Sequence, residues 1–293
     1  MVKLFVTISL VLVFTMCQPN EETSTKIKNM DSDLSNSNIA NFTCDYMGQN
    51  PPGEIPIKFA PGVISTRKDD SCFEISFTGK EMIFSRDGKI YLTGQQKNGE
   101  WKLPSPIYDG GESSFSKDGK IIYFNSRGAF PGSKVSLNVW HFKKQNEQWI
   151  KPEYLTGQVL NQVVHAPSVS SNGNIYFSGI CLLRYVNNIY QKTEKLIPPI
   201  KGSHPFISSD ESFIIFDNRP PNGGYGSDLY ISYQKDDNTW TDPFWLGDRI
   251  NTDKIETNAY VTPDREYMFF TRGFDIYWVK ANFISEIKEL VLK

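Results

Sequence analysis

The stretch FSKDGKIIYFNSR, residues 115–127, has the pattern of a β-hairpin. An apolar start leads to the turn residues Asp118 and Gly119, and an apolar run then ends at Phe124. Asp and Gly supply the backbone angles that a tight turn needs. The pattern returns as ISSDESFIIFDNR at residues 207–219 and as VTPDREYMFFTR at residues 261–272, so the chain repeats one structural unit.

Five versions of this hairpin can be aligned, at residues 73–86, 112–127, 166–179, 204–219 and 258–272. The second strand of each contains a phenylalanine close to its end: Phe84, Phe124, Phe177, Phe216 and Phe270. A third strand follows with an apolar-aromatic pair: Ile90-Tyr91, Val139-Trp140, Ile189-Tyr190, Leu229-Tyr230 and Ile276-Tyr277. Three units continue with a tryptophan and a short fourth strand that a proline introduces. Four-stranded antiparallel sheets repeated in series predict the blades of a β-propeller.

The fifth unit has no fourth strand of its own. The segment PIKFAPG, which starts at Pro56, resembles the fourth strands of the other units. An N-terminal strand that completes the last blade would close the ring without an exposed edge. The sequence therefore predicts an all-β fold, a single propeller of five four-stranded blades within residues 44–293. Six blades are the alternative, and they would need a sixth repeat.

The first 43 residues differ from the repeats. Residues 1–17 combine an early cation, Lys3, with an apolar stretch that ends just before Cys17, which is the pattern of a signal peptide. The cysteine resembles the lipid-bearing residue of bacterial lipoproteins, and Gln18 after it implies the outer membrane, with the protein in the periplasm or on the surface. Residues 18–43 are polar and predict a disordered tether.

The net charge and the number of cysteines limit which kinds of binding and which disulfides are possible. The formal net charge is −2 and no run of Lys or Arg stands out, so nucleic-acid binding has no electrostatic support. If Cys17 carries a lipid, Cys44, Cys72 and Cys181 remain, and at most one disulfide is possible. We expect a monomer that contacts the membrane only through its lipid anchor, and no cofactor.

The repeats resemble a known family. The motif S-x-D-G-K-x-x-Y-F, together with GGYGSDLYIS and WTDPFWLG, is similar to the TolB-type propeller repeats of bacterial envelope proteins. The resemblance covers approximately residues 50–285 and implies the propeller fold. It does not imply one function, because that family ranges from protein-docking modules to enzymes. The third unit departs from the pattern, with no Arg after Phe177 and no tryptophan.

Four of the five second strands are followed by an arginine: Arg86, Arg127, Arg219 and Arg272. The first strand of a blade begins at the rim where the second ends. The arginines are therefore expected beside Glu74, Glu112, Glu256, His165 and His204, around one mouth of the channel. Either they form ion pairs with carboxylates of a neighbouring blade (Glu74, Glu112, Asp228 or Asp275), or they hold an anionic ligand such as an acidic sugar or a peptide carboxyl group. Tyr225, in the loop at residues 219–228, is expected on the same rim.

His165 and His204 fall at nearly equivalent places in consecutive units. Two histidines with nearby carboxylates could hold a metal ion. The chain has no close His-x-x-x-His spacing, however, and the starts of blades are expected to lie far apart across a ring. The sequence analysis therefore predicts hydrogen bonding at the rim and no metal site.

The predicted function is non-catalytic binding of an envelope protein, a peptide or a glycan at the propeller rim. The candidate ligand-binding residues are Arg86, Arg127, Arg219, Arg272, His165, His204 and Tyr225. One alternative is a carbohydrate-active enzyme of the glycosidase type, for which Glu74, Glu112 and Glu256 are the candidate catalytic carboxylates. A purely structural envelope component is the second alternative.

Overall fold

The computed structural model describes residues 43–127, 137–155 and 165–293, and all of them belong to one compact unit, residues 38–293. The expected signal peptide, Cys17 and nearly all of the expected tether lie outside the described residues. A short 3-10 helix, η2 (Tyr46–Gly48), precedes the first strand. The three described cysteines, Cys44, Cys72 and Cys181, are free thiols.

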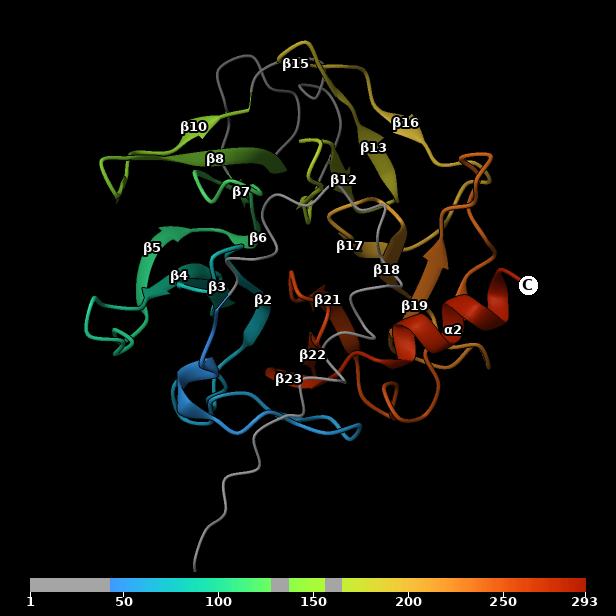
Figure 1. The fold of residues 1–293 in the computed structure, drawn as a ribbon, viewed down its shortest axis with the longest axis horizontal. Coiled ribbons are helices and arrows are strands. Elements are labelled where there is room, and N and C mark those ends of the chain that lie inside the picture. The colour runs from blue at the N-terminus through green and yellow to red at the C-terminus, as the bar shows by residue number, and fades with distance from the viewer. Residues whose placement is uncertain (1–42, 128–136, 156–164) are drawn as a thin grey trace, which may run out of the picture. The chain divides into compact units, whose positions relative to one another are not determined.

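Among the described residues, five antiparallel sheets of four or five strands are the blades, and a sixth sheet is a two-stranded hairpin (Figure 1). Blade 1 contains β2 (Asp70–Ile75), β3 (Glu81–Arg86), β4 (Lys89–Gly94) and β5 (Ser105–Asp109). Blade 2 contains β6 (Gly111–Phe115), β7 (Ile121–Arg127), β8 (Leu137–Gln145) and β10 (Glu153–Tyr154), with β9 (Gln148–Trp149) paired to β8. Blade 3 contains β11 (Ser168–Val169), β12 (Ile175–Phe177), β13 (Cys181–Leu183) and β16 (Glu194–Lys195).

Blade 4 contains β17 (Ser203–Ile207), β18 (Phe213–Asn218), β19 (Asp228–Tyr233) and β20 (Phe244–Trp245). Blade 5 contains β21 (Glu256–Val261), β22 (Tyr267–Arg272) and β23 (Asp275–Lys280), and its fourth strand is β1 (Ile57–Lys58). Ile57 pairs with Trp278 and Lys58 with Tyr277. The prediction of five blades closed by an N-terminal strand is confirmed.

The first strand of each blade lies innermost, and the five inner strands contact one another in the circular order β2, β6, β11, β17, β21 and back to β2. Figure 1 shows β2, β6, β17 and β21 around the centre and β5, β10 and β16 at the periphery. Each pair of neighbouring blades also shares one cluster of buried apolar side chains, so the core is itself divided into five parts. Burial of the phenylalanines of the repeat, all at most 1% exposed, is a main source of this packing.

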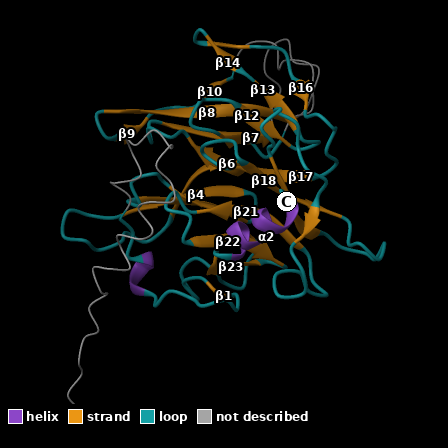
Figure 2. Cartoon of the chain, turned by 45° about the vertical axis from the view of Figure 1, so that its right-hand side comes forward, coloured by secondary structure: helices purple, strands orange, loops and turns teal. Residues whose placement is uncertain are grey.

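Two features differ from the sequence-based expectation. In blade 3 the third strand is β13, whereas Ile189-Tyr190 forms β15 (Ile189–Tyr190) of a separate hairpin with β14 (Tyr185–Val186). The chain also ends in an unpredicted helix, α2 (Phe283–Val291), shown in purple in Figure 2. Its buried residues Phe283, Ile284 and Ile287 pack against blades 4 and 5. No helix among the described residues is long and apolar enough to cross a membrane.

Candidate functional site

The inner strands share a local irregularity that shapes one mouth of the channel. One residue in each of β2, β6, β17 and β21 has a positive φ, and the pairing of that strand with the next shifts register around it. In blade 3 the corresponding residue is Ala166, two residues before β11, whose own pairing with β12 is regular. We call these five the bulge residues: Cys72, Glu112, Ala166, His204 and Asn258, with φ between 44° and 55°. A left-handed conformation is uncommon for residues other than Gly and Asn. The bulge brings residues from consecutive blades together at the mouth.

Four side chains form what we call the mouth cluster: the bulge residues Glu112 and His204, together with His165 and Asp217. Glu112 Oε1 lies 3.0 Å from His204 Nε2, and Glu112 Oε2 lies 3.3 Å from His165 Nδ1. His204 Nδ1 lies 2.7 Å from Asp217 Oδ1. The two imidazole ring centroids are 5.6 Å apart, so the expectation that these histidines lie far apart was wrong. Consecutive inner strands are direct neighbours in a five-bladed ring, which is why their ends meet.

The electrostatics of the mouth cluster follow from its hydrogen bonds. Burial alone would lower the pKa of His204, but the hydrogen bonds with Asp217 and Glu112 outweigh it and raise this pKa well above the usual value. Burial alone would raise the pKa of Glu112, but the contacts with His165 and His204 outweigh it and hold this pKa well below the usual value. His204 is therefore an imidazolium that donates to two carboxylates.

Asp217 was missed by the sequence analysis. It directly follows Phe216, at the place where the other blades have Ser85, Asn125, Ser178 and Thr271. A polar residue thus follows the strand phenylalanine in all five units, and this regularity could have predicted a polar ring at the mouth. Two of these side chains bind the next blade: Thr271 accepts from Cys72 N at 3.3 Å, and Ser178 accepts from His204 N at 2.9 Å. Asp217 accepts from Ser227 Oγ of its own blade at 2.9 Å.

The repeated arginines fall into two groups. Arg86 and Arg272 come two residues after the strand phenylalanine, whereas Arg127 and Arg219 come three residues after it. Side chains alternate between the faces of a strand, so a shift of one residue changes the direction of the side chain. Counting from the phenylalanine would have separated the two groups in advance.

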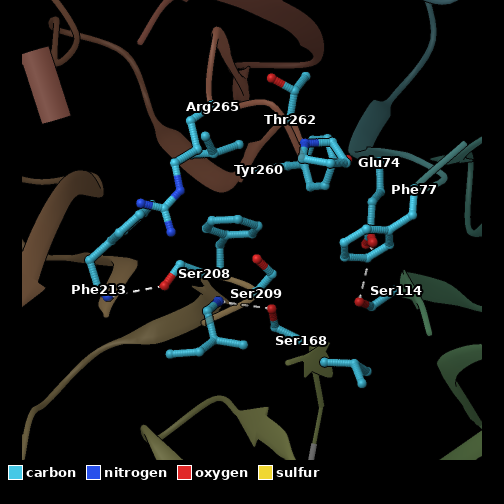
Figure 3. Close-up of a pocket in the computed structure, with 15 residues that line it drawn as sticks. Glu74, Phe77, Ser114, Ser168, Ser208, Ser209, Phe213, Tyr260, Thr262 and Arg265 are labelled. Atoms are coloured by element: carbon cyan, nitrogen blue, oxygen red, sulfur yellow. Dashed lines mark hydrogen bonds between the residues drawn. The ribbon is translucent and has the colours of Figure 1, made fainter. Parts of the chain in front are cut away.

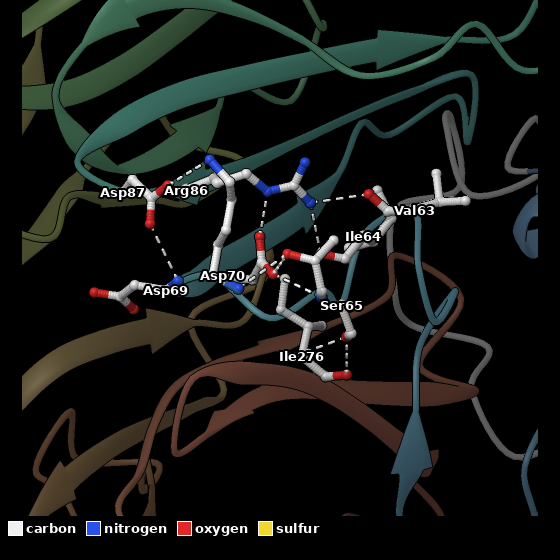
Figure 4. Close-up of polar contacts among 10 residues, drawn as sticks. Val63, Ile64, Ser65, Asp69, Asp70, Arg86, Asp87 and Ile276 are labelled. Carbon is white, nitrogen blue, oxygen red and sulfur yellow. Dashed lines mark hydrogen bonds and ion pairs between the residues drawn. The ribbon is translucent and has the colours of Figure 1, made fainter.

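Arg86 and Arg272 tie the blades together. Arg86 Nε donates to Asp70, and its Nη2 donates to the carbonyl oxygens of Val63 and Ile64 at 2.9 and 3.0 Å (Figure 4). Arg272 Nε donates to Glu256 Oε1 at 2.8 Å, and its Nη2 donates to Ile250 O at 2.8 Å. The carboxylate belongs to the first strand of the same blade, not to a neighbouring blade as the first interpretation expected. The carbonyl oxygens belong to the connection that enters from the preceding blade.

Blades 2 and 4 replace this arrangement with smaller groups. At the position of Arg86 they have Ser126, which donates to Asp109 O at 2.8 Å, and Asn218, which donates to Lys201 O at 3.1 Å. Where blades 1 and 5 have Asp70 and Glu256, they have Gly110 and Gly202. A Cβ at either glycine would lie within 2.7 Å of strand atoms of the same blade, so no carboxylate fits there. Gly110 and Gly202 thus leave blades 2 and 4 without the carboxylate that Arg86 and Arg272 use at this position.

Arg219 is exposed, and its guanidinium makes no ion pair or hydrogen bond with any residue that the structure describes. Its carbonyl oxygen accepts a hydrogen bond from Tyr230 at 2.8 Å, which fixes the start of the loop. Tyr225 in the same loop is fully exposed, at 107%. The loop reaches the mouth cluster through the Ser227–Asp217 hydrogen bond. The side chain of Arg127 lies outside the described residues.

The three candidate catalytic carboxylates, Glu74, Glu112 and Glu256, lie in three different surroundings. Glu256 is buried and fully used by Arg272 and by Thr252, whose hydroxyl donates to it at 2.6 Å. Glu112 belongs to the mouth cluster. Glu74 lies deeper than the strand starts, where its Oε1 accepts from Phe115 N at 3.0 Å, and burial raises its pKa to about 8.

Glu74 connects two cavities of the channel. The upper one is also lined by Cys72, Glu112, His204 and Asn258. Side chains of all five blades line the lower one, among them Ser114, Ser168, Ser208 and Tyr260 (Figure 3). At the far end of the channel Arg265 forms an ion pair with Asp210 at 2.7 Å, which joins blade 5 to blade 4. The channel therefore has a charged mouth, one buried carboxyl group in its middle and hydroxyl groups below.

Fold and site define this protein as a five-bladed β-propeller with a polar channel mouth. No family model and no curated protein matches the chain. Solved structures that it resembles include TolB from Acinetobacter baumannii, with 14% identity and a TM-score of 0.46 over 75% of this chain and 56% of that one. They also include a putative TolB from Agrobacterium tumefaciens, with 11% identity and a TM-score of 0.45 over 70% of each chain. The tricorn protease matches with 15% identity and a TM-score of 0.43 over 74% of this chain and 25% of that one.

The chain thus spans little more than half the length of the first of these structures. Two of the structures that it resembles are a TolB and a putative TolB, and the repeat motifs of the sequence also resemble those of TolB-type proteins. The blade count and the closure by β1 rest on the strand pairing of this chain itself.

Proposed function

We propose that this protein is a non-catalytic binding protein, and that the propeller rim around the mouth cluster takes a peptide or glycan that bears an anionic group. The observation that carries the proposal is the difference among the arginines. Arg86 and Arg272 are engaged by carboxylates that are 0% exposed, whereas Arg219 is exposed and has no partner among the described residues. An arginine fork free to bind a carboxylate gives both affinity and geometry.

Tyr225 supports the same proposal. A fully exposed tyrosine offers a flat apolar face with a polar end, which suits stacking on a sugar ring or packing against a peptide side chain. It lies on a loop between two rigid strands, β18 and β19, where scaffolds commonly carry binding residues. Arg219 and Tyr225 together would select a ligand that combines a negative charge with an apolar surface.

The proposal is tested by screening peptide and glycan arrays with the full chain and measuring the dissociation constant of the strongest hit. We expect Arg219→Ala to weaken that hit by about 10- to 100-fold, since hydrogen bonds to charged groups are worth about 1.5–3 kcal/mol. Binding should also weaken as salt rises. Arg184→Ala is the control, because Arg184 pairs with Glu194 at 3.1 Å after a third strand, at the opposite rim.

A binding constant that is the same in Arg219→Ala and in Arg184→Ala would contradict the proposal. Melting temperatures recorded for both variants separate a loss of binding from a loss of folding. We expect the melting temperatures of both variants to differ from that of the unchanged chain only by the small amount that is usual for surface substitutions.

A carbohydrate-active enzyme is the second candidate, and Glu74 is the observation that favours it. Its pKa of about 8 makes it a protonated acid at neutral pH, while Glu112 in the same cavity is a carboxylate that contacts two imidazoles. Glycoside hydrolysis commonly uses one protonated and one ionised carboxyl group that flank the scissile bond. If this candidate holds, Glu74→Gln abolishes the turnover of a glycan hit while the binding of that glycan persists.

We further propose that the propeller is held at the outer membrane through a lipid on Cys17. The apolar stretch before Cys17 and the polar segment after it support this proposal. In bacterial cells we expect the unchanged chain to partition into detergent and Cys17→Ser to remain as a precursor or a soluble product. Equal partitioning of the two forms would exclude a lipid anchor at this residue.

A further inference from the structure

The mouth cluster joins three consecutive blades through three side chains that can each bind a metal ion. Glu112 comes from β6 in blade 2, His165 lies just before β11 of blade 3, and His204 comes from β17 in blade 4. One donor atom from each lies within 4.8 Å of the other two. Their side chains are 20–32% exposed, so the site opens toward solvent.

We propose that Glu112, His165 and His204 bind one divalent transition-metal ion, with Zn²⁺ as the preferred ion, at the mouth of the channel. Two imidazoles and one carboxylate are a ligand set that zinc takes in proteins when a fourth position stays open. Zinc–ligand distances of about 2.0–2.2 Å place neighbouring tetrahedral ligands about 3.3–3.5 Å apart. Each oxygen of Glu112 is already close to that spacing from one imidazole: Oε1 lies 3.0 Å from His204 Nε2, and Oε2 lies 3.3 Å from His165 Nδ1.

The groups behind these ligands have the arrangement that orients ligands in metal sites. A ligand imidazole normally donates its other ring N–H to a carboxylate. His204 can bind the ion through Nε2 because its Nδ1 faces Asp217 Oδ1 at 2.7 Å, and Asp217 is held in turn by Ser227. Glu112 Oε2 accepts from Ala166 N at 2.9 Å. The ion would take the place of the proton that Glu112 and His204 share.

The backbone explains why three blades converge at this point. Glu112 and His204 are both bulge residues with φ of 44°, and His165 directly precedes the bulge residue of blade 3, Ala166. The other two blades have Cys72 and Asn258 at the bulge, and Cys72 does not belong to the group of donor atoms that lie close together. Glu112 and His204 also line the cavity that Glu74 lines. A ligand at the rim could thus reach the ion from the channel.

The alternative is an ion-pair network that joins the three blades without a metal. An imidazolium between two carboxylates satisfies the hydrogen-bonding atoms of His204, Glu112 and Asp217 without a metal. The observed geometry is therefore compatible with a metal site and with an ion-pair network. Metal binding by the protein distinguishes them. The inference goes beyond the proposed function, since neither Arg219 nor Tyr225 belongs to the site, and Zn²⁺ alone tests it whether or not the rim binds a peptide or glycan.

The experiment is a titration of the full chain, without a polyhistidine tag and freed of metal by a chelator, with Zn²⁺ by calorimetry. We expect one equivalent to bind with a dissociation constant in the micromolar range or below. Co²⁺ in its place should give the visible absorption of a four- or five-coordinate site. Glu112→Gln and His204→Ala should each weaken binding at least 100-fold, and Asp217→Asn by about 10- to 100-fold.

His141→Ala is the matched control, because His141 is the third histidine of the chain and lies on β8, facing Glu153 at 3.6 Å. It should bind Zn²⁺ as the unchanged chain does. If a buried variant fails to fold, His165→Ala replaces it, since the His165 side chain is 32% exposed. The proposal is overturned if no one-equivalent transition appears, or if the transition survives in the variants of the ligands, or if His141→Ala loses it equally.

Discussion

Arg272→Ala should destabilise the propeller by about 3–5 kcal/mol, the usual cost of removing one partner of a buried ion pair. Its partner Glu256 is 0% exposed and would remain as a buried charge. Ile250 O would lose its donor as well. Arg86→Ala should behave in the same way, since Asp70 is equally buried. Urea unfolding followed by tryptophan fluorescence measures both.

Arg219→Ala serves as the matched control, because it removes the same side chain from an exposed position. Its free energy of unfolding should stay within about 0.5 kcal/mol of the unchanged chain. The double variant Arg272→Met with Glu256→Gln should recover part of the loss, because no unpaired charge is then buried. An equal loss in Arg219→Ala and Arg272→Ala would show that the arginines do not differ in the way their contacts indicate.

Deletion of residues 2–61 should abolish the cooperative unfolding of the propeller. It removes β1, whose loss exposes the edge of β23, and it removes Phe59 from the core between blades 5 and 1. Phe59 is fully buried and lies 5.1–5.2 Å from the rings of Phe73, Phe269 and Trp278. Phe59→Ala alone should cost about 3–5 kcal/mol. Thermal melting by circular dichroism is the measurement.

The shorter deletion of residues 2–41 is the control, because it keeps Thr43, β1 and every contact described above. We expect it to melt as the full chain does. If the longer deletion melted at that same temperature, the ring would not depend on closure by the N-terminal strand.

The sequence by itself determined the architecture. Strand, turn and strand are local patterns, and a turn that contains Asp, Asn or Gly before an apolar run with a phenylalanine sets each hairpin without reference to the rest of the chain. Even the closure by β1 was predictable, because the segment from Pro56 carries the same local signature as the other fourth strands. The wrong assignment in blade 3 also has a local cause. Ile189-Tyr190 has the pattern of a strand whichever strand it pairs with, so the sequence could not show that it belongs to the β14–β15 hairpin and not to the third strand of the blade.

The tertiary structure alone decided which side chains meet. The distance between His165 and His204 depends on the number of blades and on the residues with positive φ near the start of each inner strand. These positions hold Cys, Glu, Ala, His and Asn, so no residue type identifies them in the sequence. The partner of each arginine depends on strand register and on the space at Gly110 and Gly202, which a repeat alignment overlooks when it shifts by one residue. The repeats determine the scaffold because each blade forms mainly by pairing of strands that follow one another in the sequence. The site forms between blades: Glu112 lies 53 positions from His165 and 92 positions (204 − 112) from His204, and only the tertiary structure brings them within hydrogen-bonding distance.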